Sequence, residues 1–353
     1  MAQIIDQIVK ISIQDAISSV TTVDVNTVAL VGKAEGKDAA EVSSLAGAKT
    51  AFGEDSELYQ MMKAFFAQDS QPYRVVGIPA GSDALAAVQA ASENFDFYHV
   101  VVATDDAQAL ALASIKEWHE WAADVKKMVH IQVPNVDAMA GTDNRSDAGY
   151  DRVAVYVHKE KTTVGEKTVY EFLPVGIVAL RCASDSARGT FAHKKCKGVT
   201  PDSYSVEEYN GAIERGLNIY VKVSGEARLF MGTTSSNEKF IDQIIKDDWI
   251  RFNVQSRIYR LLGEGNDGNG VNYDDAGIGA VAASVLNVLT VAQDTDHQYV
   301  MTDSASVDYK PYSYLVENYA EDVRKRNLPL IKGRYARMNS IHTVVQVDLQ
   351  VTL

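Results

Sequence analysis

The chain has 353 residues, of which 46% are hydrophobic, so it can bury the core of two compact domains or of one domain with a large insertion. Its formal net charge of −13 excludes a general nucleic-acid binder, because neutralising phosphates requires an excess of Lys and Arg. No run of eighteen apolar residues occurs and only Cys182 and Cys196 are cysteines, which excludes a membrane-spanning segment and a disulfide framework.

The first predicted elements are an isolated strand and then a regular alternation of strands and helices. Val9, Ile11 and Ile13 alternate with polar residues, which is the period of a half-buried strand. From residue 26 to 135, strands alternate with helices, and this spacing indicates an α/β layer with a mostly parallel sheet. We predict its strands at residues 27–31, 74–78, 98–103 and 128–133.

The next segments are predicted to be β-rich. We expect residues 153–157 to pair with residues 168–172 as a hairpin across the turn at 164–166. The stretch 184–205, rich in Ser, Asp, Lys and Pro, then predicts a crossing into another domain.

Helices dominate the predicted elements after residue 206. The longest helix of the chain is expected to begin at Ser236 or Asn237, and an amphipathic helix follows at residues 278–289. Residues 312–326 are predicted to be helical, and Pro329 prevents the helix from continuing. The apolar stripe of the longest helix consists of Ile241, Ile245, Trp249, Phe252, Tyr259 and Leu262.

The end of the chain has the alternation of a strand. Residues 343–353 place one set of apolar side chains on a single face and polar side chains on the other. An exposed strand with one apolar face is a template for pairing with another chain, although both terminal strands could also pair within their own sheet. The apolar set includes Val345, Val347, Leu349 and Val351.

Two segments resemble ligand sites but lack the required spacing. A strand leads into Gly32 and Lys33, yet a phosphate-binding loop needs four residues between its glycines and a Ser or Thr after its lysine. The acidic loop 266–275 lacks the spacing of a calcium loop and its distal Glu. The histidines are scattered, His193 near Cys196 has no orienting partner, and no carboxylate pair is singled out. We therefore expect no catalytic residue, no cofactor and no metal.

One basic segment contrasts with the acidic chain. Residues 323–338 contain six cationic residues and no acidic one. They form either a solvated helix end with a hairpin or a strip that faces an acidic partner and sets its register. This basic strip consists of Arg324, Lys325, Arg326, Lys332, Arg334 and Arg337.

Four short motifs follow one another between residues 206 and 290. In order and spacing they resemble the inner-domain signature of contractile phage tail sheath proteins of the myovirus and tailocin type. The start of the chain is similar to one branch of the same family through Ala29-Leu30-Val31-Gly32 and Ala51-Phe52-Gly53. Asn272, Asp274 and Gly270 depart from the proline, threonine and lysine that are usual there. The motifs are Gly216-Leu217-Asn218-Ile219-Tyr220-Val221, Phe240-Ile241-Asp242, Asp248-Trp249 and Val271-Asn272-Tyr273-Asp274-Asp275-Ala276-Gly277-Ile278.

The resemblance implies a structural subunit and not an enzyme. Sheath subunits stack as rings around a tail tube and contract to drive the tube through a bacterial envelope, and terminal arms add strands to sheets of neighbouring subunits. The implied partners are further copies of the chain, the tail tube protein, and the baseplate and tail terminator proteins, without nucleic acid or membrane. No secretory signal is visible at the start, and the implied location is the virion tail after assembly in the host bacterial cytoplasm.

From these patterns we predict a discontinuous inner domain and an inserted outer domain. The inner α+β domain comprises residues 1–25 and 206–353, with terminal strand arms and the basic strip as a tube-facing surface. The outer α/β domain comprises residues 26–205 and contains the mostly parallel sheet. Two alternatives stay open: an α/β enzyme that binds a nucleotide or small ligand at the carboxyl ends of its strands, and another tail or baseplate structural protein that forms a single ring.

Overall fold

The computed structural model describes residues 24–81, 83–103, 112–136, 149–158, 161–164, 167–236 and 239–342. The terminal strands predicted from the sequence lie outside this described part. Their residues are Val9, Ile11 and Ile13 at one end and Val345, Val347, Leu349 and Val351 at the other. The pairing of these strands therefore stays a prediction.

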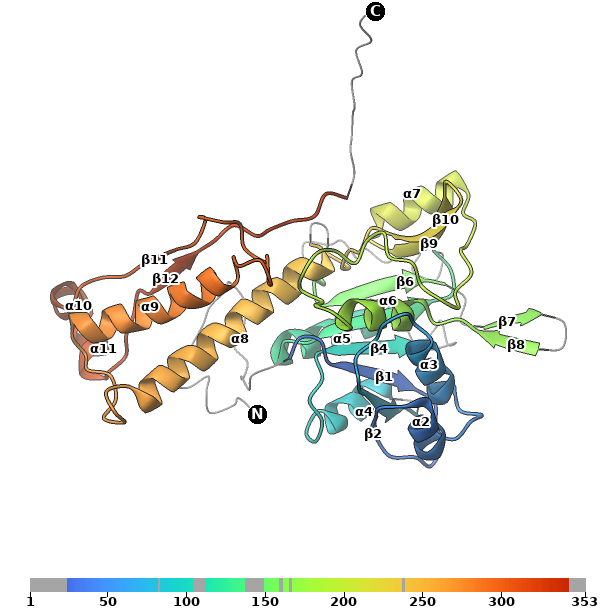
Figure 1. The fold of residues 1–353 in the computed structure, drawn as a ribbon, viewed down its shortest axis with the longest axis horizontal. Helices are drawn as coiled ribbons and strands as arrows, with labels where there is room; N and C mark the ends of the chain where they lie inside the picture. Colours follow the sequence, from blue (N-terminus) through green and yellow to red (C-terminus); the bar gives the residue numbers. More distant parts are fainter. Residues whose placement is uncertain are drawn as a thin grey trace, which may run out of the picture.

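One large sheet organises the described part of the chain (Figure 1). Its eight strands follow the order β10-β9-β6-β5-β4-β1-β3-β2. Neighbours from β3 to β9 run parallel, and the edge strands β2 and β10 are antiparallel. The predicted α/β fold with a mostly parallel sheet is thus confirmed. The strands are β1 (Val28–Gly32), β2 (Ala40–Val42), β3 (Val75–Pro79), β4 (His99–Ala103), β5 (Met128–Val133), β6 (Val153–Val157), β9 (Asn218–Val223) and β10 (Glu226–Phe230).

Helices cover both faces of the sheet. Two successive residues of β1 illustrate this. Leu30 packs on one face with α2, α3, α6 and the start of α8, and Val31 packs on the other face with α4, α5 and α7. Burial on both faces explains why most positions of the central strands are apolar. The helices are α2 (Leu45–Phe52), α3 (Glu57–Phe66), α4 (Ala84–Ala91), α5 (Leu112–Val125), α6 (Leu173–Cys182), α7 (Val206–Glu214) and α8 (Ile241–Glu264).

The helix α8 connects the sheet to a second lobe, and its length of 24 residues confirms the prediction of a longest helix here. Figure 1 shows α8 leaving the sheet and α9 returning beside it, with the remaining elements around them. We call the second half of α8 and the elements after it the helical lobe. No helix in the described ranges is long and apolar enough to cross a membrane. The further elements of the lobe are α9 (Asp275–Val291), β11 (Ser306–Asp308), α10 (Tyr312–Asn318), α11 (Ala320–Arg324) and β12 (Lys332–Arg334).

The predicted hairpin between residues 153–157 and 168–172 is wrong. β6 is a central strand that pairs in parallel with β5 and β9, and all five of its residues are buried. The hairpin is formed instead by β7 (Lys161–Val164) and β8 (Lys167–Tyr170), which project from the sheet in Figure 1. A continuous apolar run such as β6 fits a strand covered on both faces, and not one strand of an exposed ribbon.

Two helix predictions also need correction. α8 begins after Phe240, several residues later than predicted, and Tyr259 and Leu262 at the far end of its apolar stripe are 48% and 36% exposed. The predicted helix 312–326 is two short helices, because Tyr319 adopts φ −135° and ψ 36° between them. The exposed end of the stripe lies in the helical lobe, beyond the eight-stranded sheet.

The sheet contains strands from both sides of residue 206, where the sequence predicts a domain boundary. β9 lies beside β6, and β10 forms the edge of the same sheet. A domain boundary at residue 206 would separate β9 and β10 from the other strands of this sheet. The division into an inner domain, residues 1–25 and 206–353, and an outer domain, residues 26–205, stays a prediction.

Candidate assembly site at the roots of the chain ends

Gly32 and Lys33, at the end of β1, do not form an open phosphate-binding loop, because side chains of α3 contact both residues. The amide of Lys33 donates to Glu57 Oε2 at 2.7 Å, and a Cβ on Gly32 would lie 2.7 Å from Met61 Sδ. A carboxylate already occupies the backbone donor that a phosphate would need, and α3 packs against the glycine. Gly32 is therefore packed in the core between β1 and α3, and Lys33 is tied to α3 through its amide.

A buried histidine between two carboxylates is the group that most resembles catalytic machinery. His158 follows β6, and its ring nitrogens lie 2.7 Å from Glu171 Oε2 and 2.7 Å from Asp202 Oδ2. Burial lowers the pKa of His158, but both carboxylates raise it, to about 9. With both nitrogens bound, the imidazolium has no free position for a substrate proton, so the cluster ties β6 to the segments before α6 and α7.

The remaining polar candidates also lack reactive geometry. Burial raises the pKa of the Cys196 thiol to about 12, which disfavours the thiolate needed for nucleophilic attack. His193 contacts the carbonyl oxygen of His342. Asp274 caps α9 and Asp275 accepts from the Tyr312 amide, so both belong to the local structure. Among the described residues, no group of three His, Cys, Asp or Glu side chains could hold a metal.

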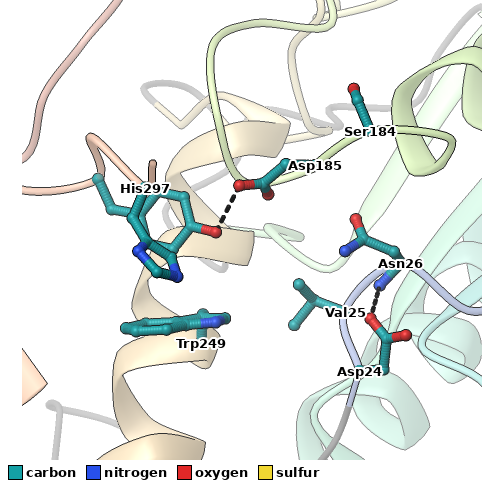
Figure 2. A pocket seen from close by; sticks show the side chains of 8 residues that line it. Asp24, Val25, Asn26, Ser184, Asp185, Trp249 and His297 are labelled. Carbon is teal, nitrogen blue, oxygen red and sulfur yellow. Dashed lines mark hydrogen bonds between the residues drawn. The ribbon is translucent and has the colours of Figure 1, made fainter. Parts of the chain in front are cut away.

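A pocket of about 230 Å³ lies where residues 24–26 enter the sheet, beside α8 (Figure 2). Its aromatic wall consists of Trp249 and Tyr299, whose ring centroids are 5.0 Å apart, with His297 beside them. Asp185 accepts a hydrogen bond from the Tyr299 hydroxyl at 2.6 Å. The pocket precedes β1, whereas ligand sites of open parallel sheets lie beyond the carboxyl ends of the strands, so its place does not favour the enzyme alternative.

The first described residues, 24–27, form what we call the N-terminal root. Val25 is 3% exposed, and its carbonyl accepts from Ser186 Oγ at 2.9 Å. The Ser186 amide donates to Asn26 Oδ1 at 2.7 Å. Both bonds come from the loop after α6, so this loop fixes the point at which the chain enters the sheet.

The last described residues, 335–342, form a strap that lies along α8, and we call them the C-terminal strap. Tyr335 donates to Asp247 at 2.8 Å, and Arg337 pairs with the same carboxylate through Nε and Nη2. Lys246 Nζ donates to the Met338 carbonyl at 2.8 Å, and Gln243 contacts Asn339 at 3.2 Å. The strap thus follows α8 back toward the sheet.

The far end of the strap reaches the sheet side of the molecule. His342 Nε2 lies 2.7 Å from Thr190 Oγ1, and the His342 ring packs edge-on against Phe240 at 4.5 Å between centroids. The loop after α6 thus forms one framework that contacts both the N-terminal root and the C-terminal strap. Sequence reasoning missed this framework, because the partners lie far apart in the chain.

The basic strip is distributed over α11, β12 and the C-terminal strap. Lys325 pairs with Glu321 at 2.6 Å and Arg334 with Asp308 at 2.9 Å, and Arg337 is bound to Asp247. For Arg324, Arg326 and Lys332, no ion pair with a described residue occurs, and all three are exposed. Half of the strip is thus neutralised within the chain.

Exposed hydrophobic side chains gather in the helical lobe. Tyr309 is 48% and Val316 is 42% exposed, whereas most large hydrophobic side chains of the sheet region are buried. The exposed side chains of the lobe are spread over α8, α9, α10 and the segments between and after them. The set in this lobe is Tyr259, Leu262, Leu286, Val291, Met301, Tyr309, Tyr312, Tyr314, Val316, Leu330, Met338 and Ile341.

The motifs that carry the family resemblance lie at structural junctions. Asn218 is fully buried and bridges Val155 and Thr233 through three hydrogen bonds. Asp242 pairs with Lys246, and Asp248 is buried in a second ion pair. A Cβ on Gly277 would lie 1.9 Å from the Asn272 carbonyl oxygen, so the turn into α9 requires glycine there. These residue types are explained by folding, without any ligand.

The fold is a mostly parallel sheet with helices on both faces, and the long helix α8 connects this sheet to a second lobe. No protein-family model and no curated protein matches the sequence. Solved structures do match, over nearly the whole of both chains. A chain in the baseplate of the anti-feeding prophage, with six-fold symmetry applied, has a TM-score of 0.69 at 13% identity, covering 97% of this chain and 98% of that one.

Two contracted sheaths have the same fold. The helical sheath of the anti-feeding prophage matches with a TM-score of 0.64 at 10% identity, covering 95% of this chain and 94% of that one. The sheath complex of the extracellular contractile injection system PVC matches with a TM-score of 0.62 at 13% identity, covering 98% and 96%. The chain therefore has the fold of contractile sheath proteins, as the sequence resemblance predicts.

Proposed function

We propose that this protein is the structural subunit of a contractile tail sheath, which polymerises as stacked rings around a tail tube and contracts to drive the tube through a bacterial envelope. One observation carries the proposal: the fold matches sheath chains over at least 94% of both partners in two contracted sheaths. A match of this extent includes the sheet, α8 and the helical lobe together, so it is not a likeness of one common α/β layer.

The described chemistry supports a structural role and not an enzymatic one. His158 is bound at both ring nitrogens, Cys196 is buried, and the pocket lies away from the carboxyl ends of the strands. The exposed hydrophobic residues of the helical lobe suit contacts with further copies of the chain. Its partners in this proposal are itself, the tail tube, and the baseplate and tail terminator proteins, in the virion tail after assembly in the host cytoplasm.

The terminal strands are proposed to join neighbouring subunits. Ser186 binds the N-terminal root and Asp247 binds the C-terminal strap. Force on either terminal arm would therefore act on a segment that is bound to the rest of the subunit. The basic strip is proposed to face the tube, with Arg324, Arg326 and Lys332 supplying its unneutralised charge. Charge at such a surface would set register and partner choice more than affinity.

Electron microscopy of the purified protein tests the function. We expect helical tubes built from stacked rings, formed by the protein alone or with its tube protein. Deletion of residues 343–353 should abolish the tubes and leave a folded, soluble protein, whereas a charge-neutral substitution on β7 or β8 serves as a control that keeps them. Compact particles under every condition would overturn the proposal.

A second candidate is a baseplate component, which the match to a chain in a baseplate structure favours. The same micrographs separate the two, because a baseplate component would form closed single rings and no long helix.

A further inference from the structure

The loop of residues 184–193, which we call the connector loop, contacts both the N-terminal root and the C-terminal strap. Near its start, Ser186 donates to the Val25 carbonyl through Oγ, and its amide binds Asn26. Near its end, Thr190 Oγ1 lies 2.7 Å from His342 Nε2, and His193 Nε2 lies 3.2 Å from the His342 carbonyl oxygen. Few residues of the loop separate the contact to one root from the contact to the other.

A single buried cation organises this loop. Arg181, at the end of α6, is 8% exposed, and its Nη2 lies 2.7 Å from the Asp185 carbonyl oxygen and 3.3 Å from that of Ser186. The same atom contacts the Arg188 carbonyl, and the guanidinium lies 5.5 Å from the centre of the Phe191 ring. Since one guanidinium binds three carbonyls along the loop, their relative positions are fixed by one side chain.

Packing beneath the loop adds to its rigidity. Ala187, Phe191 and Ala192 are fully buried. Gly232, with φ of +67°, approaches so closely that a Cβ there would lie 2.6 Å from the Ala192 amide nitrogen. A loop with several side chains in a close-packed core has little room to rearrange, because close-packed interiors transmit strain.

The connector loop also binds the segment before the strap. Asp185 accepts from Tyr299 in the pocket of Figure 2, and Arg188 Nη2 lies 3.0 Å from Gln298 Oε1. Tyr299 in turn accepts the Met338 amide through its carbonyl at 2.8 Å. A second route thus runs from the loop to the C-terminal strap.

We propose that the connector loop, held by Arg181, couples the N-terminal root to the C-terminal strap, so that a displacement of one chain end changes the freedom of the other. Within one subunit, the two predicted strand arms would then act as a linked pair. The coupling itself rests on the contacts above, and only its use in a lattice rests on the proposed sheath function.

Hydrogen exchange of the purified, unassembled full-length protein tests the coupling. Ser186→Ala removes the side-chain bond to Val25, and His342→Ala removes the contact to Thr190. We expect each variant to accelerate amide exchange at both roots, residues 24–27 and 335–342, by about 10-fold, because local opening energies set exchange rates. Ile341→Ala is the matched control, since this side chain is 83% exposed, and should leave both roots unchanged.

Arg181→Lys provides the second measurement, because it keeps the charge but removes Nη2, the atom that contacts all three carbonyls, and its shorter side chain carries the charge elsewhere. We expect it to accelerate exchange at both roots together. Should Ser186→Ala act only on residues 24–27 and His342→Ala only on 335–342, the coupling is disproved even if Arg181→Lys fails to fold. The readout needs no tubes, so a failure to polymerise and a failure of coupling give different results.

Discussion

Asp247 and Asp248 are adjacent residues of α8, and each binds one arginine and one tyrosine. The two clusters differ in how deeply they are buried. Asp248 binds both terminal nitrogens of Arg152 and accepts from the Tyr98 hydroxyl at 2.6 Å. Asp247 binds two nitrogens of Arg337 and accepts from Tyr335 at 2.8 Å. The first cluster joins α8 to the sheet, and the second joins α8 to the C-terminal strap.

The two clusters differ in burial. The side chains of Asp248 and Arg152 are 2% and 11% exposed, whereas those of Asp247 and Arg337 are 15% and 38% exposed. Removing one partner of a buried ion pair leaves an uncompensated charge, whereas water screens a partly exposed pair and can replace a lost partner. The same three chemical groups therefore hold the fold together on one side of α8 and attach a separable segment on the other.

The largest effect is expected from Asp248→Ala. The substitution leaves the Arg152 guanidinium buried without a counter-ion, which costs about 3–5 kcal/mol of the free energy of unfolding. Burial lowers the pKa of Arg152, but Asp248 more than offsets this and raises it, so the cation will not escape the cost by losing its proton. Urea denaturation followed by circular dichroism measures the loss, and a change below about 1 kcal/mol would contradict the role given to this pair.

Asp247→Ala is the matched variant, with the same change one residue away on the same helix. We expect a loss of about 1–2 kcal/mol, because Arg337 regains water when its partner is removed. Limited proteolysis should then cut within residues 335–342 while the sheet core stays intact. In about 1 M salt the difference from the unmodified protein should shrink, whereas the effect of Asp248→Ala should not. Equal effects of the two variants would remove the distinction drawn from burial.

Much of the sheet was predictable from the sequence, for a physical reason. A parallel strand covered on both faces favours apolar residues at most positions, and the predicted strand 128–133 coincides with β5. The apolar run of β6 also predicts a strand, but it does not show which strand pairs with it, and the predicted hairpin partner is wrong. Which strands are neighbours depends on chain crossings that local periodicity does not record.

The clusters on α8 were not predictable at the same level. The Asp248-Trp249 motif marked the position, but Arg152 lies 96 residues away and no local pattern connects the two. Arg337 was grouped with five other cations as a surface strip, although it is bound to Asp247. Sequence shows where charge is dense, and only the fold shows which charges are already paired.

The smallest expected effect concerns the tyrosines of the two clusters. Burial raises the pKa of Tyr98 and of Tyr335, and the neighbouring Asp248 and Asp247 raise each further. A folded pKa above the unfolded value of about 10 gives a contribution that is complete below pH 10 and is lost as the pH rises through the folded pKa. At pH 10.5 the unfolded tyrosine is mostly ionised while the folded one is not, which costs roughly 0.8 kcal/mol per tyrosine.

Tyr98→Phe and Tyr335→Phe should therefore each lose less stability than the unmodified protein between about pH 8 and pH 10.5, by a similar amount. Denaturation at the two pH values measures this, and Tyr73→Phe is the control, because Tyr73 is 83% exposed. Equal alkaline effects beside unequal effects of the two Asp→Ala variants would show that both hydroxyls are held alike by their carboxylates. The clusters would then differ in the burial of the arginine and not in the carboxylate geometry. A normal alkaline response of Tyr335→Phe, matching that of Tyr73→Phe, would mean that the strap leaves α8 in solution.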